Sequence, residues 1–225
     1  MTARKPTGLI VVVGMLSEAR IVEGEGIGVF VSGGSASQLS GFLDNLAQDV
    51  SAGIVSFGLC GGLDPSLRTG DLIIESNNDA WLGRLESALP GARKGNVAGG
   101  DAMIAGASEK QALRQQLGAD AIDMETHQVK AFAERTGTPY AVVRAVSDPA
   151  HSALPRAALV GLKPDGDTDA FAVIRSLGLR PWELPALLRT AREADAALRA
   201  LRNARDLLGP GLGCPDFVEH LVDVT

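Results

Sequence analysis

Three short apolar segments, each followed directly by glycine, constrain the fold of this chain more than any other feature. They lie at residues 8–13, 28–32 and 53–57 and are rich in valine and isoleucine. Runs of this length and composition are typical of strands that are buried on both faces of a sheet. Similar runs predict further strands at residues 70–75, 119–124 and 140–146.

Helical patterns lie between and after these runs. Residues 35–49 and 127–135 have the apolar spacing of amphipathic helices, and a longer pattern covers residues 182–208. Strands that alternate with helices predict an α/β fold with a largely parallel sheet. The length suits one domain, residues 1–225, in which residues 180–209 form a C-terminal, Arg-rich amphipathic helix.

Composition excludes several classes of protein. A net charge of −6 argues against a nucleic-acid partner, which would favour a basic surface. Two cysteines in 225 residues, no signal peptide and no apolar stretch of membrane-spanning length predict a cytoplasmic protein. The histidines lack the spacing of metal ligands, and neither a dinucleotide nor a P-loop motif is present, so we expect no metal and no cofactor.

Three carboxylates follow the predicted strands. Glu18 comes after the first strand, Glu125 after the fifth and Asp148 after the last. Ligands of open parallel sheets bind beyond the carboxyl ends of the strands, so we expect these side chains to share one edge. Such a set suits cleavage of a nucleoside. An acid kept protonated by burial can assist the leaving purine at N7, while a carboxylate orients the ribose and stabilises its developing positive charge.

Several motifs carry a family resemblance. Asp123-Met124-Glu125, residues 142–148 (VVRAVSD), residues 58–63 and residues 67–71 resemble the purine nucleoside and uridine phosphorylase family. Met15 and Glu18 resemble the N-terminal pair of the methylthioadenosine/S-adenosylhomocysteine nucleosidases. The hopanoid-associated phosphorylase branch is more similar still, through residues 14–21, 60–65, 147–149, 154–155 and 158–160 and the Arg-rich helix. The resemblance implies a three-layer α/β/α fold with a mixed, mostly parallel twisted sheet.

The resemblance also implies a role for each matching residue. Asp148 would donate to purine N7, oriented by Ser147, and Glu125 would bind the ribose hydroxyls above Met124. Arg144 would pair with Glu125 or place the nucleophile, and Glu18 would position a water or bind the sugar. Further substrate contacts would come from Met15, Cys60, Gly61 and Gly62, and phosphate contacts from Arg20, Ser32, Gly33 and Gly34.

One residue departs from the family pattern. Leu59 stands where many members carry a Ser or Thr that helps to bind phosphate. Phosphorolysis, with inorganic phosphate as co-substrate, is our first expectation, and hydrolysis remains open. The substrate implied by the branch is a 5′-substituted adenosine, adenosylhopane. Its 5′ group would be accommodated by residues 77–107 and 150–185. A methylthioadenosine-type nucleosidase and a general purine nucleoside phosphorylase are the alternatives within the fold.

Other interpretations stay open at individual residues. Asp148 could cap a turn before Pro149, Glu125 could complement a helix dipole, and Arg144 could form a structural ion pair. The Arg-rich helix could be a solvated face or could contact the inner membrane through Trp182 and nearby leucines. The family implies a homo-oligomer. A non-catalytic nucleoside- or lipid-binding module is the rival from another functional class.

Overall fold

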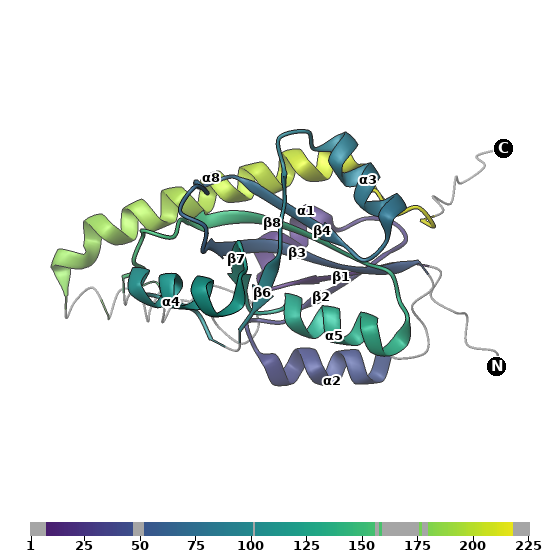
Figure 1. Cartoon of the computed structure of the whole chain (residues 1–225), viewed down its shortest axis with the longest axis horizontal. Helices are drawn as coiled ribbons and strands as arrows, with labels where there is room; N and C mark the ends of the chain where they lie inside the picture. The colour runs from purple at the N-terminus through teal and green to yellow at the C-terminus, as the bar shows by residue number, and fades with distance from the viewer. Residues whose placement is uncertain are drawn as a thin grey trace.

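The computed structural model describes residues 8–46, 52–100, 102–155 and 180–217, together with Ala158 and Ser176. Its strands are β1 (Leu9–Val13), β2 (Ile27–Val31), β3 (Gly53–Gly62), β4 (Leu72–Ser76), β5 (Arg93–Lys94), β6 (Val97–Gly99), β7 (Ala121–Asp123) and β8 (Tyr140–Asp148). Its helices are α1 (Leu16–Val22), α2 (Ala36–Leu46), α3 (Asp79–Ala88), α4 (Ala107–Leu117), α5 (Thr126–Thr136), the short η1 (Pro181–Glu183) and α8 (Leu184–Leu208) (Figure 1).

The strands form one mixed sheet in the order β2-β1-β3-β8-β4-β5, and β7 joins β3 to β6. The four neighbouring strands β2, β1, β3 and β8 are parallel. Strand β4 runs antiparallel to β8, and β7 runs antiparallel to β3. The mixed, mostly parallel sheet is therefore confirmed, but the expectation that the fifth predicted strand ends at the same edge as the others is wrong, because β7 runs antiparallel to β3.

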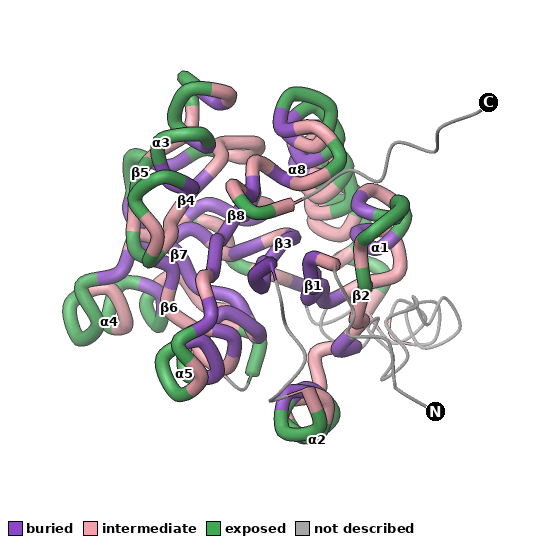
Figure 2. Tube along the Cα trace, turned by 90° about the vertical axis from the view of Figure 1, so that its right-hand side faces the viewer, coloured by how far each residue is buried: buried purple, intermediate pink, exposed green. Residues whose placement is uncertain are grey.

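Helices cover both faces of the sheet and make three layers (Figure 2). Helices α1, α3 and α8 pack on one face, where residues such as Phe57, Trp81 and Leu201 form the larger apolar cluster. Helices α2 and α5 pack on the other face through a second cluster that includes Leu39 and Phe132. The strands are thus covered by protein on both faces, which is why their sequences are continuous hydrophobic runs.

The longest central strands extend further than their apolar runs predict. β3 continues past Phe57 through the glycines to Gly62, and β8 continues to Asp148. The strand predicted at residues 53–57 is therefore too short, because the glycines that follow stay in the ladder and leave room for functional side chains. Helix α2 ends at Leu46, and residues 47–49 of the predicted helix lie outside the described residues.

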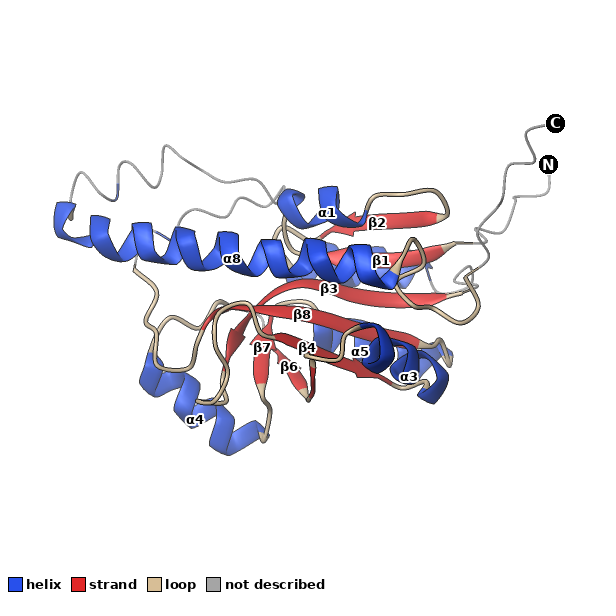
Figure 3. Ribbon diagram, turned by 90° about the horizontal axis from the view of Figure 1, so that it is seen from above, coloured by secondary structure: helices blue, strands red, loops and turns tan. Residues whose placement is uncertain are grey.

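Helix α8 runs alongside the strands and projects past one end of the sheet (Figure 3). Its C-terminal half is anchored by buried Ala197, Leu201, Ala204 and Leu208. Its N-terminal half extends past the carboxyl ends of the central strands (Figure 1). Within the described residues, no helix is both long enough and apolar enough to cross a membrane.

Candidate active site

A cavity of roughly 470 Å³ opens at the carboxyl ends of β1, β3 and β8. One end of it is polar and is lined by Glu18, Asp123, Glu125, Arg144, Ser147 and Asp148. The rest of its wall is apolar and comes from elements distant in sequence, including α8. The three carboxylates that the sequence places after separate strands therefore meet in one cavity.

Arg144 is the only cation among the residues of this polar end. Its side chain is 1% exposed, and its guanidinium lies 2.6 Å from Asp123 Oδ2 and 3.2 Å from Glu125 Oε2. It also donates to Ser56 Oγ at 2.6 Å and to the Leu59 carbonyl at 3.1 Å. A buried guanidinium needs this many acceptors, because a buried charge without partners is very costly. Arg144 thus fixes the Glu125 carboxyl, as one of its two predicted roles requires.

Glu125 reaches the cavity by an unexpected path. Strand β7 begins opposite Gly62 at the end of β3 and runs back along it, so the residues that follow β7 return toward the cavity. Ser32 Oγ donates to Glu125 Oε1 at 2.8 Å. Burial is the main cause of the raised pKa of Glu125, and the Arg144 cation opposes it.

Glu18 is held as a buried acceptor of three backbone N–H groups. Its Oε2 accepts from Gly14 and Met15, and its Oε1 accepts from Leu59, each at 2.8 Å. The first two bonds close the start of α1. Burial raises the pKa of Glu18 to about 7; Arg144 lowers it and the negative charge of Glu125 adds to the rise. Glu18 therefore changes its charge near neutral pH.

Glycines allow these charged groups to approach the backbone. Gly58 lies in β3 with φ of +148°, and a Cβ at this position would lie 2.6 Å from Glu18 Oε1 and 2.8 Å from Arg144 Nη1. A Cβ at Gly14 would lie 3.2 Å from Glu125 Oε1 and 3.5 Å from Glu18 Oε2. Both carboxyls therefore border Gly14, and any other residue at Gly58 would displace the pair that it separates.

Asp148 sits in a buried ion pair that the sequence did not reveal. Lys110 Nζ lies 2.5 Å from Asp148 Oδ2, and Ser147 Oγ donates to Asp148 Oδ1 at 2.6 Å. The link to Ser147 is as the resemblance implied. The expected role of burial at Asp148 is therefore incomplete, because the carboxyl also has a cation as its direct partner.

The apolar part of the cavity is built from three segments. Met103 and Ile104 precede α4, Leu154 follows β8, and α8 contributes Leu187 and its neighbours Thr190, Ala191 and Ala194. The first two segments fall within the stretches predicted to accommodate a 5′ group. The helix residues were missed, because their apolar stripe predicts packing and does not distinguish a core from a cavity wall.

Most of the predicted site residues meet at the cavity, and a few do not. The lining includes Glu18, Glu125, Asp148, Met124, Ser147, Arg144, Cys60, Gly61, Met15 and Gly34. Gly33, Gly62, Ser32 and Arg20 are not part of the lining; Arg20 is exposed, and Ser32 contacts Glu125 instead. Among the described residues, no cluster of side chains could hold a metal ion.

Comparison with known proteins agrees with this geometry. A family model described as the phosphorylase superfamily matches residues 78–172. The futalosine hydrolase of Helicobacter pylori has a similar structure, with a TM-score of 0.58 and 13% identity over 87% of this chain and 96% of that chain. The chain has the phosphorylase-superfamily fold. No match was found among the curated proteins.

Two nucleosidases for 5′-methylthioadenosine and S-adenosylhomocysteine share this fold. The enzyme from Colwellia psychrerythraea, in complex with adenine, has a TM-score of 0.59 and 15% identity over 90% of this chain and 96% of that chain. The enzyme from Campylobacter jejuni has a TM-score of 0.57 and 16% identity over 87% and 98%. The family match and the shared fold support the predicted class, an enzyme of the nucleoside phosphorylase and nucleosidase type.

Proposed function

We propose that the protein hydrolyses the N-glycosidic bond of a 5′-substituted adenosine and releases adenine. The observation that carries this proposal is that Asp148, Glu125 and Glu18 line a single cavity with an apolar extension. Asp148 faces the purine and passes a proton to N7 as the bond to C1′ breaks. Glu125, fixed by Arg144, accepts hydrogen bonds from the ribose hydroxyls and stabilises the positive charge on the sugar.

Water is the nucleophile in this proposal, with Glu18 as its base. The oxygen of water bonds to C1′ as the electrons of the C1′–N9 bond pass to the base, and the Glu18 carboxylate takes the proton that the water loses. The position of Glu18 supports this role, because its carboxyl and that of Glu125 both border Gly14. A pKa of about 7 leaves much of Glu18 ionised at neutral pH.

Hydrolysis now has better support than the phosphorolysis that we first expected. Each group considered for phosphate is already engaged or lies elsewhere. The N–H of Leu59 donates to Glu18, that of Gly33 donates to the Gly14 carbonyl, and that of Gly34 donates to Ser32. Arg20 is exposed and outside the cavity lining. The polar end also holds four carboxylates against Arg144 and the buried Lys110 that pairs with Asp148, a balance that repels phosphate.

The apolar extension favours a large apolar 5′ group. Polar side chains are scarce beyond the acidic end, where methionine, isoleucine, leucine and alanine form the wall. A 5′-lipid substituent such as that of adenosylhopane would bury apolar surface there, at a gain of about 25 cal/mol for each Å² removed from water. Adenosylhopane is therefore the substrate that we propose. We also propose that the protein contacts the membrane that holds this lipid. A homo-oligomer remains a prediction from the resemblance.

The decisive experiment measures free adenine after incubation with adenosylhopane, methylthioadenosine and adenosine, each with and without phosphate. We expect release that does not depend on phosphate and that is fastest for the substrate with the largest apolar 5′ group. Asp148→Asn serves as the inactive control, with a loss of about 10²–10⁴-fold. Strict dependence on phosphate would establish phosphorolysis. Tight adenosine binding without any adenine release would favour the non-catalytic binding module.

A further inference from the structure

Lys110 on α4 is completely buried and points at the Asp148 carboxyl. Its Nζ contacts Asp148 Oδ2 at 2.5 Å and the carbonyls of Asp148 at 3.0 Å, Pro149 at 3.1 Å and Ser152 at 3.3 Å. All four acceptors come from the last residue of β8 and the short segment that follows it. An ammonium group has three hydrogens, so they are shared among four oxygens within one segment.

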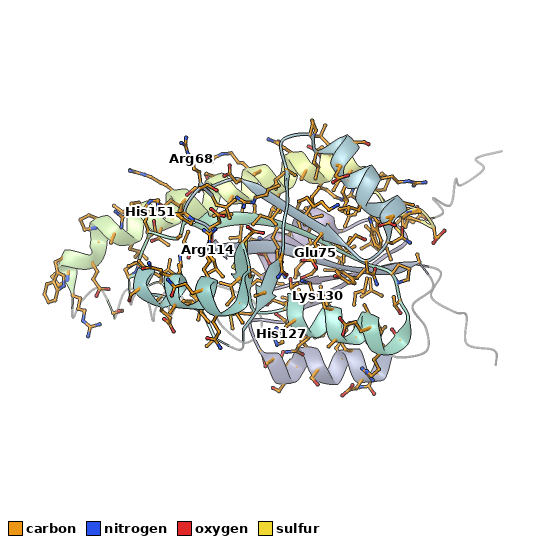
Figure 4. The ribbon with its side chains drawn as sticks, viewed as in Figure 1. Arg68, Glu75, Arg114, His127, Lys130 and His151 are labelled. Carbon is orange, nitrogen blue, oxygen red and sulfur yellow. The ribbon has the colours of Figure 1, made fainter. Side chains whose placement is uncertain are left out.

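The fold gives Lys110 its place through α4. Lys110 is the buried residue of this helix, and Leu113 packs, partly buried, against a small apolar cluster, whereas Leu117 is exposed. One turn further along, Arg114 pairs with Asp64 Oδ2 at 2.7 Å and ties α4 to the segment that follows β3. Figure 4 labels Arg114 on this helix. The Arg114–Asp64 pair thus holds α4 independently of Lys110 and remains when Lys110 is replaced.

We propose that Lys110 is a positioning residue that acts through Asp148 and stores the proton that the carboxyl passes to the departing base. This inference rests on the proposed hydrolysis. In the resting pair the proton is on Lys110 Nζ. As the C1′–N9 bond breaks, the proton moves from Nζ to Asp148 Oδ2 and from there to N7, so Asp148 ends as it began, a carboxylate. Lys110 ends as a neutral amine.

The proton balance closes over the whole turnover. The water that attacks C1′ gives its proton to Glu18, so one proton is stored at Glu18 while one is missing at Lys110. Exchange with solvent after product release returns the enzyme to its resting state. Ser147 keeps Asp148 Oδ1 occupied, which leaves Oδ2 as the oxygen that mediates the transfer. Lysine suits this role, since its ammonium can lose a proton in a buried site and an arginine cannot.

Other ionisable groups around the pair do not replace Lys110. The Cys60 thiol lies on β3, the neighbouring strand, and burial raises its pKa far above neutral. Asp123 precedes the turn into α5, Arg144 lies earlier on β8, and both belong to the sugar-side cluster. His151 is exposed on the segment that Lys110 holds. Among the residues that the structure describes, Lys110 is the only cation paired with Asp148.

The test compares the pH dependence of kcat/KM for Lys110→Met, Lys110→Gln and Lys110→Arg, with Arg114→Gln as a matched control. Without Lys110, the proton that Asp148 passes to the base must come from solvent, which supplies it more readily at low pH. We expect the Met and Gln variants to lose at least about 100-fold at pH 8 and to stay within about tenfold of wild type at pH 5. The Arg variant keeps the charge but withholds the proton, so its kcat falls by at least about 100-fold at both pH values.

Structural and chemical roles give different results in this experiment. Arg114→Gln loosens the docking of α4, and we expect its pH profile to match that of the wild type. Near-normal turnover by Lys110→Arg would overturn the proposal, because charge and position alone would then suffice. An equal loss at every pH in the folded Gln variant, checked by circular dichroism and adenosine binding, would also overturn it. If the wild type releases no adenine, the proposed function fails as well.

Discussion

Glu18 is a buried carboxyl whose pKa, at about 7, lies well above that of the unfolded chain. As the base for water it must be ionised, so we expect kcat to fall as the pH drops through about 7. Glu18→Gln should lose at least about 100-fold in kcat and should lose this limb of the pH profile. A wild-type kcat that stays flat between pH 5 and 8 would contradict the assignment of Glu18 as the base.

The same shift makes a prediction about stability. Since the pKa of Glu18 is raised by folding, the native state binds a proton that the unfolded chain releases above about pH 4.5. Its contribution to stability is complete below that pH and is lost as the pH rises through 7, by about 3 kcal/mol. Urea unfolding at pH 5 and pH 8 should show this decline in the wild type and a smaller one in Glu18→Gln. Equal declines in the free energy of unfolding of the two proteins would show that Glu18 is not the source of the pH dependence.

Gly58 is a position in β3 that only glycine can occupy without displacing its neighbours. Its φ of +148° excludes a side chain, and so does the closeness of Glu18 and Arg144 to the position that a Cβ would take. We expect Gly58→Ala to lower the free energy of unfolding by about 1–3 kcal/mol and to abolish adenine release. Gly41→Ala in α2 is the control, because a Cβ there meets no atom within 4 Å. Full activity of Gly58→Ala would mean that the Glu18–Arg144 arrangement tolerates displacement.

At the level of elements, β1, β2, β8 and the helices α2, α5 and α8 could be predicted from local pattern alone. Helix α4 could not be predicted in this way, because its sequence has few large apolar residues and its buried residue is a lysine. The direction of β7 is fixed by its pairing with Gly61 and Gly62, a contact that no local pattern records. The carboxylates were found because they follow strands and match family motifs. Lys110 was missed because its partner lies 38 residues away.

Helix α8 provides the wall that should decide which 5′ groups fit. Ala194 faces the cavity, so Ala194→Phe would fill part of the apolar extension. We expect kcat/KM for adenosylhopane to fall by at least about tenfold relative to that for adenosine, because overpacking rejects the larger group first. Leu207→Phe, at an exposed position near the other end of α8, should leave the ratio unchanged. Parallel losses for both substrates would place the 5′ group elsewhere.

For the whole molecule, the proposed substrate raises the question of how a lipid nucleoside would reach the cavity. The N-terminal end of α8 extends beyond the sheet, and Trp182, Leu184 and Leu188 are exposed there at 72%, 46% and 49%. The adjacent Leu187 lines the cavity, so one helix segment joins the exposed apolar side chains to the site. Residues 180–195 contain three arginines and three acids, so attraction to a membrane there would come from apolar contact and not from net charge.

We therefore expect the protein to sediment with phosphatidylcholine vesicles and with anionic vesicles to a similar extent, with little effect of salt. Replacing Trp182, Leu184 and Leu188 with Ser should abolish sedimentation and lower kcat/KM for vesicle-bound adenosylhopane, while turnover of adenosine stays unchanged because the polar end of the cavity is untouched. Leu207→Ser removes an exposed leucine far from this end and should bind vesicles normally. If the triple variant sediments like the wild type, α8 is not the membrane contact, and the lipid must enter by another side of the cavity.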